Sequence, residues 1–142
     1  MSRSKYNVSS NKEKRTYDGV VFDSELECRF YKEIILPNYK SGKIKNYELQ
    51  KPYVLQEKFK RDGKTISAIK YVADFFIEWD DGRVEVIDTK GMADSVAKIK
   101  RKMMWSLFPA LDFKWISYCK KYGGWIEFDE LNRLRRDAKK NK

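Results

Sequence analysis

The chain has 142 residues, of which 42% are hydrophobic and 37% are charged, so it is long enough and apolar enough to fold as one domain. It contains no histidine, which excludes Ser-His-Asp triads, histidine-ligated zinc sites and HNH-type nuclease chemistry. Its formal net charge of +10 favours a polyanionic partner, either nucleic acid or an acidic membrane surface.

The excess of positive charge is concentrated in three segments. Residues 1–16 contain five basic residues and one acidic residue, residues 93–108 four and one, and residues 129–142 six and three. Residues 17–92 are nearly neutral, with 13 basic and 14 acidic residues. We therefore expect a flexible basic arm over residues 1–16, a folded domain over residues 17–128 and a basic C-terminal helix or tail. The alternative for both ends is that they are solvated tails that keep the protein soluble.

Turn and breaker residues divide the chain into helices and strands. The Asp62-Gly63 and Asp81-Gly82 pairs predict two β-hairpins, and Pro37 predicts the end of a helix. The elements expected after the basic arm are, in chain order, a helix from about Ser24 to Leu36, strands at 44–49 and 53–59 broken at Lys51-Pro52, strands at 71–79 and 84–90, a helix at 93–108, a strand at 112–118, a loop at 120–124 and a helix at 129–140. This order predicts the α/β (α+β) class, with a central mixed, mostly antiparallel sheet flanked by helices.

Two aspartates occupy core-facing positions on the strands at 71–79 and 84–90. Asp74 shares one strand face with Val72 and Phe76, and Asp88 shares one with Val84 and Val86. A carboxylate on such an apolar stripe costs on the order of several kcal/mol unless a cation or hydrogen bonds meet it. Together the two aspartates form a candidate Mg²⁺ site. Lys90 points to the same face as Asp88, where an ammonium can orient or deprotonate a water molecule. The structural alternatives are a buried Asp74 held by a Lys or Tyr, and a salt bridge between Asp88 and Lys90.

The first helix supplies a third carboxylate. At about 100° per residue, Glu27 falls inside the apolar arc of this helix, whereas Glu25 falls on its polar side. The alternative role for Glu27 is local, because Ser24 and Glu27 have the spacing of a capping box at the helix start. Capping and catalysis do not exclude one another.

The helix at 93–108 has a basic face and an apolar face. Lys98, Arg101 and Lys102 are spaced i, i+3, i+4 and could follow a phosphate backbone, although an ordinary solvated face would have the same pattern. A second stripe is expected to face the core and consists of Val96, Ile99, Met103 and Leu107. The candidate DNA contacts are thus Lys98, Arg101 and Lys102, with Lys12, Lys14 and Arg15 in the arm and Arg135 and Arg136 in the last helix.

The ordered set of a helix glutamate, an aspartate and an Asp-x-Lys motif resembles the PD-(D/E)XK nuclease superfamily, without the proline of its name. Over residues 17–118 the chain also resembles small phage-encoded proteins of this class. The blocks that carry the resemblance are Phe22-Asp23-Ser24-Glu25-Leu26-Glu27, Glu48-Leu49-Gln50-Lys51-Pro52, Tyr71-Val72-Ala73-Asp74-Phe75 and Asp88-Thr89-Lys90-Gly91. The resemblance implies a restriction-endonuclease-like core. Gln50 matches a block but has no role that the sequence predicts beyond a hydrogen bond at the end of a strand.

The resemblance also implies a site and a reaction. Asp74, Asp88 and the backbone carbonyl of Thr89 would bind Mg²⁺ or Mn²⁺, Glu27 would act on the same metal directly or through water, and Lys90 would position the attacking water. The reaction would be hydrolysis of a DNA phosphodiester bond that leaves a 5′-phosphate and a 3′-hydroxyl.

The motif order is similar to that of phage endonucleases that resolve Holliday junctions and of the transposon-end nuclease of the Tn-seven type. This similarity implies a phage-encoded, metal-dependent endodeoxyribonuclease that acts as a homodimer on branched DNA in recombination or replication. The alternatives are a nicking or processing nuclease without junction selectivity, and a non-catalytic nucleic-acid-binding protein whose acidic cluster is structural.

The sequence gives no sign of export or of a membrane span. No apolar run approaches the ~18 residues that a transmembrane helix needs, and residues 1–15 lack the apolar segment of a signal peptide. Cys28 and Cys119 are expected to be reduced, with one disulfide as the alternative. We therefore expect a protein with no membrane partner that stays in the cytoplasm of its cell or of a phage host.

Overall fold

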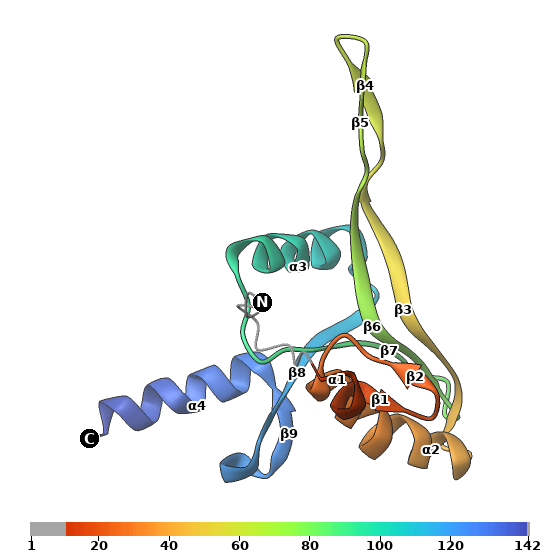
Figure 1. Cartoon of the computed structure of the whole chain (residues 1–142). Helices are drawn as coiled ribbons and strands as arrows, with labels where there is room; N and C mark the ends of the chain where they lie inside the picture. Colours follow the sequence, from red (N-terminus) through yellow and green to blue (C-terminus); the bar gives the residue numbers. More distant parts are fainter. Residues whose placement is uncertain (1–10, 142) are drawn as a thin grey trace.

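The computed structural model describes residues 11–141 of the chain. At its centre is a five-stranded sheet in the strand order β3-β6-β7-β8-β9, in which only β7 and β8 are parallel neighbours (Figure 1). The strands of this sheet are β3 (Ile44–Gln56), β6 (Ile69–Trp79), β7 (Val84–Thr89), β8 (Asp112–Cys119) and β9 (Gly124–Glu127). The predicted α/β class with a mixed, mostly antiparallel sheet flanked by helices is confirmed.

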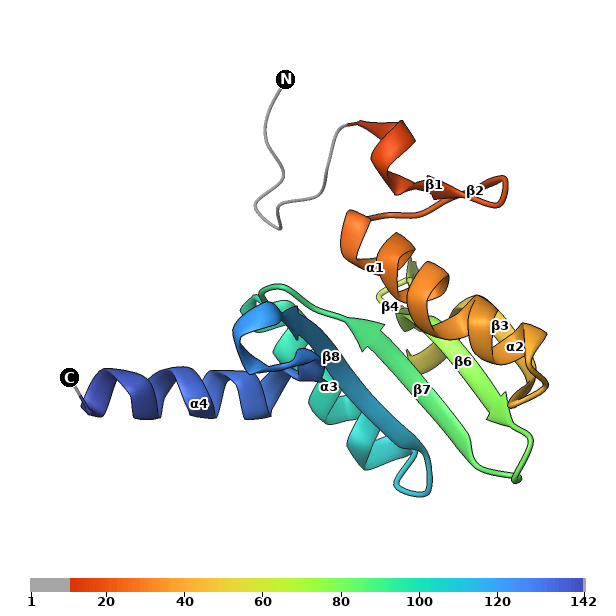
Figure 2. The same ribbon diagram turned by 90° about the horizontal axis from the view of Figure 1, so that it is seen from below.

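Helices pack on both faces of this sheet (Figure 2). On one face lie α1 (Glu25–Phe30), the π-helical η2 (Tyr31–Ile35) and α2 (Leu36–Lys40). On the other face, α3 (Ser95–Leu107) connects β7 to β8, because parallel strands need a long crossover connection. The last helix, α4 (Phe128–Lys140), projects away from the sheet (Figures 1 and 2). The short elements are η1 (Lys12–Arg15), β1 (Thr16–Tyr17), β2 (Val20–Val21) and η3 (Lys120–Tyr122).

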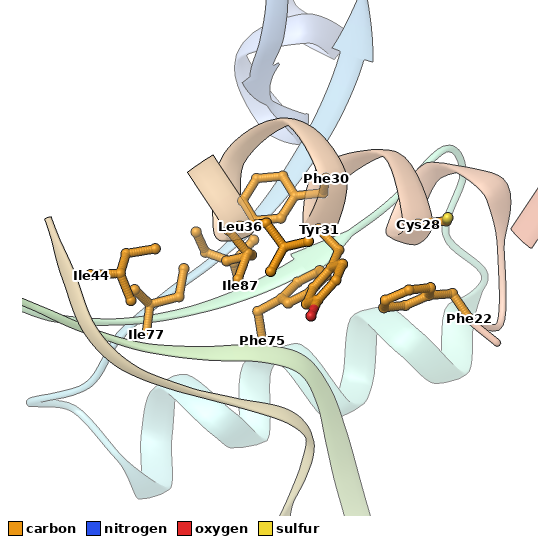
Figure 3. Packing of buried hydrophobic residues seen from close by; sticks show 10 residues of the cluster. Phe22, Cys28, Phe30, Tyr31, Leu36, Ile44, Phe75, Ile77 and Ile87 are labelled. Atoms are coloured by element: carbon orange, nitrogen blue, oxygen red, sulfur yellow. The ribbon is translucent and has the colours of Figure 1, made fainter. Parts of the chain in front are cut away.

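The sheet separates two hydrophobic clusters, because successive side chains of a strand point to opposite faces. Ile87 of β7 belongs to the cluster under α1 and α2, where Phe30 and Phe75 lie with ring centroids 5.0 Å apart (Figure 3). Its neighbour Val86 belongs to the cluster on the other face, together with Met104 of α3. Both clusters fix β6 and β7, which carry the predicted catalytic residues.

Beyond the sheet, β3 and β6 continue into a hairpin made of β4 (Phe59–Arg61) and β5 (Lys64–Ile66). This hairpin projects from the body of the protein (Figure 1). Asp62 and Gly63 at its tip both have positive φ, +50° and +76°, as a two-residue type I′ turn requires. The two hairpins predicted from Asp-Gly pairs are therefore confirmed, since β6 and β7 pair across Asp81-Gly82.

The prediction that Pro37 ends the first helix is wrong, because the helix continues to Lys40. A π-helical turn precedes the proline, and the N–H of Leu36 bonds to the carbonyl of Tyr31 five residues earlier. Pro37 therefore lies in the first turn of α2, where the missing N–H of a proline is tolerated.

The expected break at Lys51-Pro52 is also wrong. A single strand, β3, runs through Pro52, which lies opposite Val72 of β6. Because β3 is the edge strand of the five-stranded sheet, a proline can be accommodated there.

The segment after β8 is more regular than the predicted loop at 120–124, since Gly124 begins the strand β9. Two successive glycines, Gly123 and Gly124, have positive φ and led to the loop prediction. Gly124 also lies against Tyr118, where a Cβ would come within 3.3 Å of the ring. The positive φ and this tight contact both favour glycine at the start of β9.

The predicted core stripe of α3 is wrong at three of its four positions. Val96 and Ile99 are 57% and 59% exposed, and Leu107 is also exposed. Met103 does pack against the core, but the helix is buried mainly through Ala97 and Met104, about a quarter turn away from the predicted stripe.

The segment expected to be a flexible basic arm is described from Asn11 onward. The Asn11 side chain accepts a hydrogen bond from the Glu13 N–H and caps η1. Arg15 donates from Nη1 to the carbonyl of Phe22 at 2.8 Å. This end of the segment is thus attached to the domain, while residues 1–10 lie outside the described residues.

Both cysteines of the chain lie within the described residues 11–141. Cys28 and Cys119 are both free, as expected. Within the described residues, no helix has the length and apolar character needed to cross a bilayer.

Candidate active site

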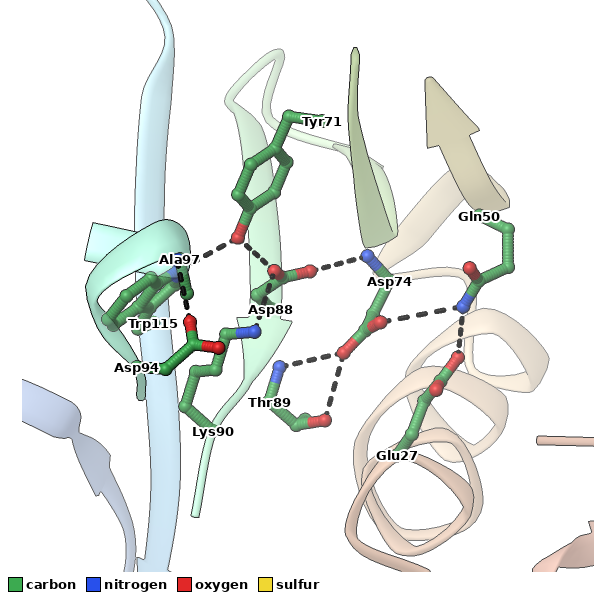
Figure 4. Close-up of polar contacts among 10 residues, drawn as sticks. All are labelled: Glu27, Gln50, Tyr71, Asp74, Asp88, Thr89, Lys90, Asp94, Ala97 and Trp115. Atoms are coloured by element: carbon green, nitrogen blue, oxygen red, sulfur yellow. Dashed lines mark hydrogen bonds and ion pairs between the residues drawn. The ribbon is translucent and has the colours of Figure 1, made fainter. Parts of the chain in front are cut away.

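A cavity of about 990 Å³ lies where the N-terminal end of α1, the middle of β6 and the C-terminal end of β7 meet. All residues predicted for catalysis or metal binding line it: Glu27, Asp74, Asp88, Thr89 and Lys90. Figure 4 shows these side chains gathered from the three elements. The structure therefore brings together residues that are up to 63 positions apart in the sequence.

The two aspartates lie on neighbouring antiparallel strands. Phe75 of β6 pairs with Ile87 of β7, and the same register places Asp74 opposite Asp88. The N–H of Asp74 donates to Oδ1 of Asp88 at 2.7 Å. The N–H and the Oγ1 hydroxyl of Thr89 both donate to Oδ2 of Asp74 at 2.9 Å. Main-chain donors thus orient both carboxylates.

A buried chain of hydrogen bonds holds Asp88 from the side of β8. The Tyr71 hydroxyl donates to Oδ2 of Asp88, and Nε1 of Trp115 donates to the Tyr71 oxygen at 2.8 Å (Figure 4). All three residues are buried. The sequence alone indicated no site role for Tyr71 or Trp115. The available signal was the tyrosine on a buried stripe, because a buried tyrosine hydroxyl usually finds a partner.

Glu27 enters the site from the first turn of α1. The Ser24 Oγ accepts the N–H of Glu27 at 3.0 Å, which confirms Ser24 as the N-cap. The Glu27 side chain, only 2% exposed, accepts a hydrogen bond from Nε2 of Gln50 at 2.5 Å. The predicted difference from Glu25, which is exposed, is confirmed.

Gln50 joins two of the carboxylates. Its Nε2 donates to Glu27 and lies 3.4 Å from Oδ1 of Asp74. Gln50 has φ +54°, a left-handed conformation that is unfavourable for a residue with a side chain, and it is skipped in the pairing of β3 with β6. The local distortion of the strand turns the amide toward the site. The sequence alone did not predict this role for Gln50.

Lys90 follows the end of β7. Its Nζ lies 3.8 Å from Oδ2 of Asp88 and 5.3 Å from the centre of the Trp115 ring, and its side chain is 25% exposed. The Ser117 hydroxyl donates to the carbonyl of Lys90, and the N–H of Lys90 bonds to Ile116, so the main chain at this point is fixed to β8. The ammonium therefore lies beside the carboxylates with partial access to solvent.

Crowding of carboxylates in this cavity disfavours their ionised forms. Burial, followed by the charges of Asp88 and Glu27, raises the pKa of Asp74 well above its usual range. Burial raises the pKa of Asp88 as well, although Lys90 opposes this. Burial and the charge of Asp23 raise the pKa of Glu27 to about 7. Such a cluster favours the uptake of protons or of a cation.

The donor chemistry fits a hard divalent cation. The carboxylate oxygens of Asp74, Asp88 and Glu27 are ligands of the type that Mg²⁺ and Mn²⁺ prefer, and a cation among them would offset their repulsion. In the part of the chain that the structure describes, no three acidic, cysteine or histidine side chains are arranged to hold a metal ion as they stand. Each carboxylate instead accepts hydrogen bonds within the protein. A role for the Thr89 carbonyl as a ligand stays a prediction.

Seven of the eight predicted DNA contacts fall into three groups. Arg135 lines the cavity, together with Lys100, which the sequence analysis did not select. The exposed basic residues are Lys12, Lys14, Lys98, Lys102 and Arg136. Arg15 is bonded to the main chain at Phe22, as described above.

Arg101 does not share the exposed face predicted for it. Its side chain is 13% exposed, its guanidinium lies 4.0 Å from the centre of the Trp115 ring, and Nη1 lies 3.0 Å from Oδ2 of Asp129. A planar guanidinium can stack on an aromatic face while it pairs with a carboxylate, and here both partners belong to the protein itself, the buried Trp115 and the exposed Asp129. We therefore remove Arg101 from the candidate DNA contacts.

Comparison with known proteins gives a family but no activity. None of the curated proteins matches the chain. The model of a family described as "Protein of unknown function (DUF1064)" matches residues 3–124, a span that includes every residue predicted for catalysis or metal binding. Because this match covers most of the 142 residues, the chain belongs to the DUF1064 family.

Proposed function

We propose that the protein is a metal-dependent endodeoxyribonuclease that hydrolyses phosphodiester bonds. The observation that carries the proposal is the gathering of Glu27, Asp74, Asp88 and Lys90 in one cavity, with the pKa values of all three carboxyl groups raised. The net charge of +10 would attract DNA to the protein, and the acidic cluster is a small region of opposite charge within this positive field.

In this proposal, each residue of the cavity would have a separate role in metal binding or in hydrolysis. Asp74, Asp88 and the Thr89 carbonyl would hold Mg²⁺ or Mn²⁺, and Glu27 would act on the same ion directly or through water. When bound, the ion would supply charge stabilisation to the phosphate and a water of lowered pKa. Lys90, with Nζ 3.8 Å from Asp88, would orient the attacking water and offset negative charge that develops on the phosphate.

The residues around this set would keep it in place. Tyr71 and Trp115 restrict the rotation of Asp88, and Gln50 couples Glu27 to Asp74. Such supporting contacts commonly change activity by roughly 10–100-fold when they are removed from metal sites.

The resemblance of the motif order supports the finer features of the proposal. These are a phage origin, action in the host cytoplasm, branched DNA such as a Holliday junction as substrate, a role in recombination or replication, a homodimer, and 5′-phosphate products. A nicking or processing nuclease without junction selectivity would use the same cavity. The second candidate function is a non-catalytic nucleic-acid-binding protein, which is favoured by the internal hydrogen bonds that Asp74 and Asp88 already accept.

The test is incubation with plasmid, linear duplex and four-way-junction DNA in Mg²⁺ or Mn²⁺, beside Asp74→Ala and Lys90→Ala. We expect cleavage by the wild-type protein and a loss of at least about a hundredfold in both variants. No cleavage of any substrate with either metal would leave the DNA-binding alternative. Equal rates for wild type and both variants would refute the assignment of the site.

A further inference from the structure

A projecting strand pair leads directly away from the candidate active site. We refer to residues 54–70, which comprise β4, β5 and the outer ends of β3 and β6, as the ribbon. Every residue of β4 and β5 is exposed, and Figure 1 shows the ribbon extending beyond the body of the protein. Its base adjoins the cavity, because Lys70 and Val72 of β6 line the same cavity as Asp74.

The ribbon carries a strong positive charge. It has five basic and two acidic residues: Lys58, Lys60, Arg61, Lys64 and Lys70, against Glu57 and Asp62. Among the described residues, the only ion pair on it is the exposed contact of Arg61 with Asp62 at 3.8 Å. The remaining ammonium groups are therefore available to a polyanion.

The outer part of the ribbon is well defined although every residue of β4 and β5 is exposed, while Leu55 at its base is buried in the core. Its turn is fixed by Asp62 and Gly63, and its register pairs Phe59 with Ile66, which remain 42% and 40% exposed. Two-stranded ribbons that are isolated in water are only marginally stable. A defined and exposed ribbon of this kind gains stability when a partner covers it.

The dimensions of the ribbon match duplex DNA. At about 3.3 Å per residue, the 11 positions from Asp74 to Gly63 span at most roughly 36 Å, close to the ~34–36 Å of one turn of the double helix. The major groove, about 12 Å wide, admits a two-stranded ribbon.

We infer that the ribbon is a DNA-contacting element that lies along duplex DNA to one side of the cleaved phosphate, up to about one helical turn away. This inference rests on the proposed function, since it takes the cavity as the place where the phosphate binds. It adds a contact surface to the basic residues of α3, α4 and the N-terminal segment. It also predicts that the substrate contains intact duplex DNA on at least one side of the cleaved phosphate.

The test compares two triple variants at matched exposed lysine and arginine positions. The ribbon variant is Lys60→Ala, Arg61→Ala and Lys64→Ala, and the control variant is Lys40→Ala, Lys43→Ala and Lys45→Ala, at the opposite end of β3. Binding to a labelled duplex is measured against salt concentration without Mg²⁺ or Mn²⁺, so that nothing is cut. We expect the ribbon variant to lower the slope of log K against log salt by up to about 2.7 and to raise the Kd roughly tenfold or more. The control should match wild type.

Wild-type footprinting supplies a second measurement that needs no variant. Protection should extend about 10 base pairs from the cleaved phosphate on one side. Equal slopes for the ribbon and control variants, or a footprint confined to the cleavage site, would overturn the inference while leaving the nuclease intact. A dimer that becomes monomeric only in the ribbon variant would assign the ribbon to a protein interface and would also overturn it.

Failure of the proposed function gives a different result. If the wild-type protein binds duplex but cuts nothing, the nuclease proposal fails and the ribbon is still judged from the salt slopes. If it binds no duplex, both proposals fail.

Discussion

The buried hydroxyl of Tyr71 gives the sharpest test of how the site is held. Tyr71→Phe removes a hydrogen bond to a carboxylate, worth about 1.5–3 kcal/mol, and leaves the Trp115 N–H unpaired, which costs about 1–3 kcal/mol. The two contributions overlap, so we expect the free energy of unfolding to fall by about 2–4 kcal/mol. In urea titrations at pH 7 this loss should appear as a lower midpoint with an unchanged m-value.

Tyr53→Phe is a matched control, because Tyr53 of β3 pairs directly with Tyr71 of β6. The Tyr53 hydroxyl is buried and has no hydrogen-bond partner among the described residues. Its removal should leave stability unchanged or raise it by up to about 1 kcal/mol. Equal destabilisation by the two substitutions would refute the view that a specific hydrogen-bond chain, rather than ring packing, holds Asp88.

Glu27, Gln50 and Arg101 each give a further expected outcome. Because burial raises the pKa of Glu27 from 4.5 to about 7, its stabilising contribution is fully present below pH 4.5 and is lost as pH rises through 7. In urea titrations, the free energy of unfolding of Glu27→Gln should therefore match that of wild type near pH 5 and exceed it by about 2–3 kcal/mol near pH 9. For the exposed Glu25→Gln we expect a difference from wild type that does not change with pH. The same pH-independent difference for Glu27→Gln would contradict the raised pKa. Gln50→Gly relieves the strained φ but removes the amide that links Glu27 to Asp74. The rate of DNA cleavage should fall at least about tenfold, while the free energy of unfolding stays within about 1 kcal/mol of wild type. An unchanged rate would exclude a role of Gln50 in the site. Arg101→Ala should lower the unfolding free energy by about 1–3 kcal/mol, because Arg101 packs on Trp115. Lys98→Ala, at an exposed position of the same helix, should lower it by less than about 0.5 kcal/mol. Equal effects of the two substitutions would contradict the packing of Arg101 against the protein.

Local chemistry was enough to predict the elements that carry the carboxylates. The two Asp-Gly turns fix strand pairing through positive φ, and the register then places Asp74 beside Asp88. The helical arc likewise placed Glu27 in the interior. The turns, the pairing of Asp74 with Asp88 and the inward position of Glu27 depend only on residues near in sequence or on one strand pair. They could therefore be predicted from one sequence without an alignment.

The errors arose where tertiary contacts override local preference. Pro37 is tolerated because a π-helical turn precedes it, and Pro52 because β3 is an edge strand. In α3, Arg101 stacks on Trp115 and is only 13% exposed, although the helical spacing of the basic residues placed it on an exposed face.

The role of Gln50 could not be predicted for the same physical reason. Its side chain reaches Glu27 and Asp74 only because the backbone adopts a left-handed conformation in the middle of a strand. Nothing in the residue type favours that conformation, so it is imposed by the surrounding contacts.

The rate of plasmid cleavage as a function of Mg²⁺ concentration, measured for the wild-type protein beside Asp74→Asn, tests the central claim most directly. Asparagine keeps the shape of the side chain but removes the charge that would help to hold a cation. We predict no cleavage in EDTA, a saturable rise with Mg²⁺ for wild type, and a rate at least about a hundredfold lower for the variant. Cleavage that is absent at every Mg²⁺ concentration, or that is equally fast in the variant, would contradict the proposal that this acidic cavity cuts DNA.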